Sequence, residues 1–137
     1  MGVMSYIDDH PTRFNFRGDV RKAVNRVQKK FPFQTFANTY VGHPPGFGGK
    51  YDRVSVDFWG GGKRNGRYAG YRGKPLPHNV GDRVFRAIFN DKHKPNISWI
   101  IWRGRMWVRG KGWGPAPGGP PDSDAGHQKH IHVTFML

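Results

Sequence analysis

Three histidines near the end of the chain are the first candidates for chemistry. His127, His130 and His132 fall within one short stretch of a sequence that holds 7 histidines. Residues two apart on a β-strand share a face, so a strand over residues 130–135 would place His130 and His132 side by side. Neighbouring imidazoles on one strand face are typical either of a metal pair or of histidines on a solvated sheet. Because the chain has no cysteine, any transition metal would need histidine and carboxylate ligands.

A second group of polar residues strengthens the metal hypothesis. His43 begins a loop that follows a predicted strand, and Asp57 lies on the polar face of the next predicted strand. With His132 they form a set of two histidines and one carboxylate, which suits a catalytic zinc that keeps water in its fourth position. Asp52 is the competing carboxylate ligand.

The elements that would position these residues follow from hydrophobic periodicity. Spacings of three and four indicate helices, alternation indicates strands, and clusters of glycine and proline indicate loops. The sequence thus predicts one α+β domain over residues 1–137, with two helices, an antiparallel sheet of about four or five strands, and an N-terminal extension at 1–16. The predicted helices are 17–31 and 80–89; the strands are 33–41, 53–59 (ended by glycines 60–62), 97–102, 106–108 and 130–135; the irregular segments are 42–49, 63–79 and 110–126.

The charge balance points to a polyanionic partner. There are 23 Lys and Arg against 9 acidic residues, all of them Asp, so the formal net charge is +14. Nucleic acid, an anionic cell wall and an acidic membrane surface all fit this excess. No apolar run is long enough to span a membrane. The first residues lack the basic and apolar regions of a secretory signal, so we expect no signal peptide.

The residues His43, Ser55-Val56-Asp57 and 127–133 resemble the zinc D-Ala-D-Ala carboxypeptidase and peptidoglycan endopeptidase superfamily, which has the Hedgehog/DD-peptidase fold and includes phage endolysins. The order of the predicted elements is also similar, and the resemblance covers roughly residues 17–136. It implies a zinc ion held by His43, Asp57 and His132. It also implies catalytic roles for His130 and His127, and substrate binding by Arg53 and Ser55.

Two departures from that family's pattern are visible. His43 and Asp57 are fourteen residues apart, about twice the usual spacing, so residues 44–51 would be an inserted loop. The chain also has no Glu to act as a general base. That role would fall to His130, or to an acid such as Asp122 or Asp124.

The resemblance implies a lytic enzyme that cuts peptidoglycan stem peptides, acting from the host cytoplasm on the cell wall or from a virion. Its partner would be peptidoglycan or another anionic cell-wall polymer. Three alternatives stay open. A structural phage or wall protein could keep this fold with a decayed site, and a nucleic-acid-binding protein would explain the charge and the aromatic residues. A non-haem iron oxygenase also uses two His and one carboxylate.

Overall fold

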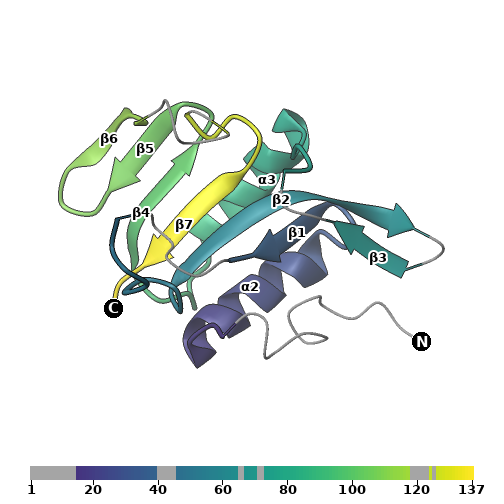
Figure 1. The fold of residues 1–137 in the computed structure, drawn as a ribbon, viewed down its shortest axis with the longest axis horizontal. Coiled ribbons are helices and arrows are strands. Elements are labelled where there is room, and N and C mark those ends of the chain that lie inside the picture. The colour runs from purple at the N-terminus through teal and green to yellow at the C-terminus, as the bar shows by residue number, and fades with distance from the viewer. Residues whose placement is uncertain (1–14, 40–45, 65–66, 71–72, 118–123, 125) are drawn as a thin grey trace.

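The protein is a small α+β structure with two helices and an antiparallel sheet of six strands, in the order β1-β2-β7-β4-β5-β6 (Figure 1). A short strand, β3, pairs with the far half of β2. The computed structural model describes residues 15–39, 46–64, 67–70, 73–117, 124 and 126–137. The elements are α2 (Gly18–Lys30), β1 (Thr35–Asn38), β2 (Ser55–Arg64), β3 (Arg67–Gly70), α3 (His78–Phe89), β4 (Ile97–Trp102), β5 (Arg105–Val108), β6 (Gly112–Pro115) and β7 (Ile131–Phe135).

Both helices form where the sequence predicts them. In α2 the buried residues recur at helical spacing, Asp19 lies in the first turn and Lys29 and Lys30 lie in the last. These charges complement the helix dipole, and Pro32 follows the end of the helix because proline cannot continue it. Neither described helix is long and apolar enough to cross a membrane.

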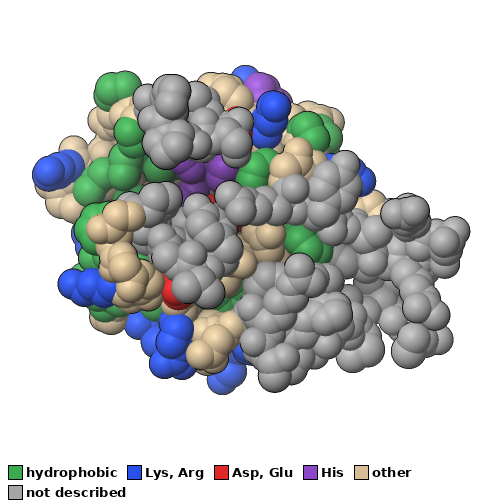
Figure 2. Space-filling view, in the orientation of Figure 1, with side chains coloured by type: hydrophobic (Ala, Val, Ile, Leu, Met, Phe, Trp, Pro, Cys, Tyr) green, Lys and Arg blue, Asp and Glu red, His purple; other side chains and the backbone are tan. Residues whose placement is uncertain are grey.

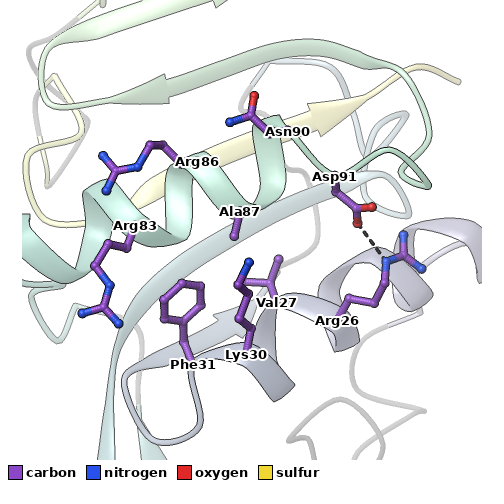
Figure 3. A pocket seen from close by; sticks show the side chains of 9 residues that line it. All are labelled: Arg26, Val27, Lys30, Phe31, Arg83, Arg86, Ala87, Asn90 and Asp91. Atoms are coloured by element: carbon purple, nitrogen blue, oxygen red, sulfur yellow. Dashed lines mark hydrogen bonds and ion pairs between the residues drawn. The ribbon is translucent and has the colours of Figure 1, made fainter.

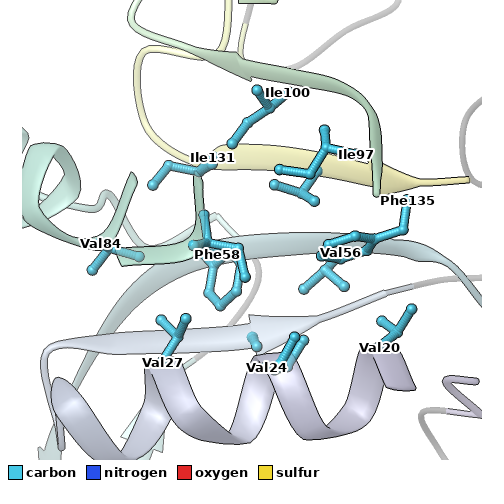
Figure 4. Close-up of a cluster of buried hydrophobic side chains, with 14 of the residues drawn as sticks. Val20, Val24, Val27, Val56, Phe58, Val84, Ile97, Ile100, Ile131 and Phe135 are labelled. Atoms are coloured by element: carbon cyan, nitrogen blue, oxygen red, sulfur yellow. The ribbon is translucent and has the colours of Figure 1, made fainter. Parts of the chain in front are cut away.

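The helices pack on one face of the sheet and form the hydrophobic core with it. Val20, Val24 and Val27 of α2 point toward Val56 and Phe58 of β2 (Figure 4). Strands β4 and β7 contribute further fully buried side chains from the same face. Fully burying one such aliphatic or aromatic side chain stabilises the fold by about 1.5–3 kcal/mol. Because side chains alternate along a strand, Asp57 must point to the opposite face of β2 from Val56 and Phe58.

The predicted end of the Asp57 strand was wrong. Strand β2 continues through Gly60, Gly61 and Gly62 to Arg64, and part of the predicted 63–79 loop pairs with it as β3. A Cβ at Gly60 would lie 2.3 Å from the carbonyl oxygen of Pro75, and one at Gly61 would lie 2.8 Å from that of Thr35. These glycines therefore permit close backbone packing within a strand and do not end it.

The C-terminal half has one more strand than the sequence predicts. The predicted hairpin forms between β4 and β5, and its two turn residues, Arg103 and Gly104, have φ of 53° and 76°. Two positive φ values match the turn that suits the twist of a hairpin. The predicted irregular segment 110–126 contains β6, which pairs with β5. The closing strand begins at Ile131, so His130 directly precedes β7 and is not its first residue.

Candidate metal centre

The polar residues gather where β2 and β7 pair. In this antiparallel register Ser55 lies opposite Thr134, and Asp57 lies opposite His132. One step further along, the ring of Trp59 stacks on the ring of His130 at a centroid distance of 4.0 Å. Histidine side chains are visible near the middle of the face shown in Figure 2. One strand register thus brings residues about 75 positions apart in sequence onto the same face of the sheet.

Asp57 is at the centre of this group and is almost fully buried, with 2% of its surface exposed. Its Oδ1 atom lies 3.1 Å from Nδ1 of His132 and 3.5 Å from Nε2 of His130. On its other side Asp57 pairs with Asn38 of β1. Within the described part of the chain, the buried carboxamide oxygen of Asn38 accepts no hydrogen bond. A buried carboxylate beside an unsatisfied oxygen is costly unless a cation or a donor compensates it.

The hydroxyls of Thr134 and Ser55 support the His132 ring on the side of its Nε2 atom, away from Asp57. Its Nε2 lies 2.7 Å from Oγ1 of Thr134, which is 2.9 Å from Oγ of Ser55. If Nε2–H donates to Thr134, Nδ1 is a bare acceptor that faces the Asp57 carboxylate. Two acceptors at 3.1 Å require a shared proton or a cation between them. In the other tautomer Nδ1–H donates to Asp57 and the Thr134 hydroxyl donates to Nε2.

His130 is held by a different carboxylate. Its Nδ1 lies 2.7 Å from Oδ2 of Asp124, and both residues are buried. Asp124 also accepts the backbone N–H groups of Gln128, Lys129 and His130. Burial alone would raise the pKa of Asp124, but the hydrogen bonds from His130 and from the Lys129 N–H outweigh it and lower that pKa below its ordinary value. The ionised carboxylate favours a proton on Nδ1 of His130, and Nε2 of the same ring faces Asp57.

The structure brings together some of the residues expected from the sequence and separates others. Asp57, His130 and His132 lie together, and the ring of His127 is 4.5 Å from that of His130. Arg53 is exposed just before β2, and Asp52 lies in the preceding turn. His43 and Asp122 lie outside the described residues.

The substrate-binding role expected for Ser55 stays a prediction. Its side chain is fully buried, and its hydroxyl lies 2.9 Å from that of Thr134. Through Thr134 it supports the ring of His132.

Sequence reasoning missed Asn38, Thr134 and the position of Trp59. Their positions in the strands could have identified them, because residues two apart on β2, and the residues opposite them on β1 and β7, must lie on the same face as Asp57. The register itself was not predictable from local patterns.

An aromatic cluster lies on the other side of His132. Trp99 is nearly parallel to the ring of His132 at 6.5 Å, Tyr51 packs edge-on against Trp99 at 5.3 Å, and Phe47 packs against Tyr51 at 5.2 Å. Phe47 is 53% exposed, which is unusual for so large an apolar side chain. Together with Trp59, these rings flank the histidines with apolar surfaces.

One pair of described donor atoms has a separation that either a hydrogen bond or a shared zinc ion would allow. Two ligand atoms of a tetrahedral zinc with bonds near 2.0–2.1 Å are about 3.3 Å apart. The 3.1 Å separation between the Asp57 and His132 donors is close to this value. Among the residues that the structure describes, no three His, Asp or Glu side chains form a group arranged to hold a metal ion. The third ligand expected from the sequence is His43.

Comparison of the chain with family models, with curated proteins and with solved structures finds no match. The function is therefore inferred from the geometry of the site and from the residue pattern in the sequence.

Proposed function

We propose that this protein is a zinc-dependent peptidase that hydrolyses peptide bonds in the stem peptides of peptidoglycan. The observation that supports it most is the β2–β7 register, which sets Asp57 opposite His132 with their donor atoms 3.1 Å apart and buried. Aspartate and histidine are ligands that zinc prefers. Asp57, His132 and His43 would hold the ion, which would polarise the scissile carbonyl and lower the pKa of a bound water.

His130, positioned by Asp124, would be the general base in a chain that has no Glu. With its Nδ1 proton directed at Asp124, His130 presents Nε2 toward Asp57 and can accept a proton from the attacking water. The negative charge of Asp124 stabilises the imidazolium that forms. The same proton can then pass to the leaving amine. The stacked Trp59 ring keeps the imidazole in this orientation.

The remaining groups favour a substrate with an apolar part. The aromatic cluster of Phe47, Tyr51 and Trp99 offers an apolar wall beside His132. Peptidoglycan is proposed as the source of the peptide because of the resemblance of the histidine and aspartate pattern to peptidoglycan peptidases, and because a net charge of +14 favours an anionic wall.

The test is hydrolysis of purified peptidoglycan, followed by the appearance of new amino groups and by mass analysis of the released peptides. We expect His132→Ala to lose bound zinc and activity together. His130→Ala should keep most of the zinc and lose about 100-fold or more in turnover, which is the range for removal of a general base. His93→Ala is the matched control, since His93 is exposed in the turn after α3. Full zinc content in His132→Ala would contradict the ligand assignment.

A second candidate function follows from the same geometry. Both ring nitrogens of His132 and Nδ1 of His130 already have protein partners. A polar network satisfied in this way also stabilises a fold without catalysis. In that case the protein would be a structural relative with an inactive site, and neither zinc at one ion per chain nor peptide release would be observed.

A further inference from the structure

The helical face holds a cationic groove that the proposed peptidase site does not use. A cavity of about 680 Å³ lies between α2 and α3 (Figure 3). Four of its lining side chains are cationic, and a single carboxylate, Asp91, opposes them. The cations are Arg26 and Lys30 on α2, and Arg83 and Arg86 on α3.

Most of this positive charge is available to a ligand. Asp91 pairs with Arg26 at 2.8 Å, yet Nη2 of the same guanidinium is buried and has no hydrogen-bond partner among the described residues. Lys30, Arg83 and Arg86 are exposed along the groove. The nearby Asp82 already accepts hydrogen bonds from Trp102 and Arg103. Like charges on one helix and on facing helices repel one another, so an anion in the groove would relieve a cost that the fold otherwise bears.

The shape and chemistry of the groove favour a slender chain of phosphates. Arginine forks bind phosphate oxygens in pairs. Single-stranded nucleic acid is normally held by aromatic rings on which its bases stack. Among the described residues that line the groove, Phe31 alone is aromatic; it is buried and has the Arg83 guanidinium 5.4 Å from its centroid. The groove thus offers cations for phosphates and no open ring for bases.

We propose that the α2–α3 groove binds the phosphodiester backbone of an anionic wall polymer of the poly(glycerol phosphate) type. This binding does not depend on the histidine site, because the sheet separates the two faces. The wall as the setting rests on the proposed function; there, the groove would hold the protein through its helical face, opposite the polar face of β2 and β7.

The test compares two triple variants that each remove three positive charges from the net +14. The groove variant is Lys30→Gln, Arg83→Gln and Arg86→Gln. The control variant is Lys22→Gln, Lys92→Gln and Lys111→Gln, which changes exposed cations that do not line the groove. Binding is measured by fluorescence anisotropy with labelled poly(glycerol phosphate), and with a labelled single-stranded DNA of equal charge, from about 50 to 200 mM salt.

We expect the groove variant to bind poly(glycerol phosphate) at least about tenfold more weakly than the wild type, and the control variant to change less than about threefold. The slope of log K against log salt should fall by about 2 in the groove variant, at about 0.7 for each phosphate that the protein no longer neutralises. Equal losses of affinity in the two variants would overturn the proposal, because binding would then depend on the overall positive charge and not on the groove. The absence of measurable binding by the wild type would also overturn it.

A third contrary result would be DNA binding that depends on the groove when poly(glycerol phosphate) binding does not, since the ligand would then be nucleic acid. An unchanged circular dichroism spectrum in the groove variant would show that it is folded. Because binding is measured without hydrolysis, a failure of the groove proposal is distinguishable from a failure of the proposed peptidase activity.

Discussion

The two faces of strand β2 are buried to the same degree and differ completely in chemistry. Val56 and Phe58 pack against the helices with no exposed surface, while Ser55 and Asp57 on the other face are 0% and 2% exposed. Apolar burial stabilises the fold directly. Burial of a carboxylate costs free energy unless partners compensate it, so the polar face reduces the stability that the same strand would otherwise provide. A cost of this kind at adjacent positions on two strands is typical of a functional site.

The two faces of the sheet also differ in the charge of the side chains that they gather. The polar face concentrates carboxylates and histidines, whereas the groove between the helices concentrates arginine and lysine. The two sites therefore suit ligands of different kinds. If the two faces are independent, variants on one face should leave the other unchanged.

The largest effect on stability is expected for Asp124→Ala. This change leaves the buried backbone N–H and ring of His130, and the partly buried N–H groups of Gln128 and Lys129, without their acceptor. The free energy of unfolding should fall by about 3 kcal/mol, measured by urea denaturation. Asp19→Ala is the matched control, because Asp19 pairs with Arg17 at a site where its side chain is 52% exposed, and its loss should cost less than about 1 kcal/mol. A cost below about 1 kcal/mol for Asp124→Ala would show that this carboxylate does not organise the polar face.

The contribution of Asp124 should also depend on pH. Its pKa in the folded protein is lower than the ordinary value of 3.8, so its stabilising contribution is complete above that value and is lost as the pH falls through the folded pKa. The difference in unfolding free energy between the wild type and Asp124→Ala should therefore narrow as the pH falls from about 7 to about 2. Urea midpoints measured at several pH values test this, and a gap that stays constant over this range would contradict the assigned charge.

A smaller loss of stability, confined to the helical face, is expected for Gly81→Ala. A Cβ at this position in α3 would lie 2.1 Å from the ring of Trp102, so the helix or the ring must move. Overpacking of this kind costs about 2 kcal/mol. Gly18→Ala is the control, because a Cβ there meets nothing within 4 Å and should be neutral or slightly stabilising. Zinc content should be unchanged in both variants, and its loss in Gly81→Ala would show that the two faces are coupled.

The smallest change in stability is expected for Thr134→Val, which keeps the shape of the side chain and removes the hydroxyl between His132 and Ser55. We expect a cost of about 1 kcal/mol. The affinity for zinc should fall by about tenfold, because partners of a metal-binding histidine orient its ring. Titration with a competing chelator measures this. Unchanged affinity would mean that Thr134 does not position His132.

The sequence was most informative where local spacing determines structure. The apolar positions of α2 and α3 recur at helical intervals, and the turn at Arg103 and Gly104 follows from its short length. Strand β6 and the glycine part of β2 gave no such signal, because glycine has no side chain to show alternation. These segments are specified by their neighbours, such as Phe89, which packs against Trp113 of β6.

The sequence indicated which residues form the candidate site, but it did not indicate how their partners are arranged around them. Asp57, His130 and His132 were recognised from chemistry and spacing, but the partners that orient them come from distant segments. Asn38 and Thr134 reach the site only through the pairing of β1, β2 and β7, and Asp124 reaches His130 through a turn. The alternation in β2 indicated a polar face and did not reveal that this face is buried.

The most direct test of the account is the zinc content of the purified protein, wild type against Asp57→Asn, by elemental analysis after supply of zinc and removal of the excess. Asn keeps the size of the side chain and removes its charge, and His93→Ala controls for the loss of a histidine elsewhere. We predict one zinc per chain in the wild type and in His93→Ala, and a loss of most of it in Asp57→Asn. A wild-type protein that holds no zinc, or an Asp57→Asn variant that keeps it all, would contradict the proposed metal centre.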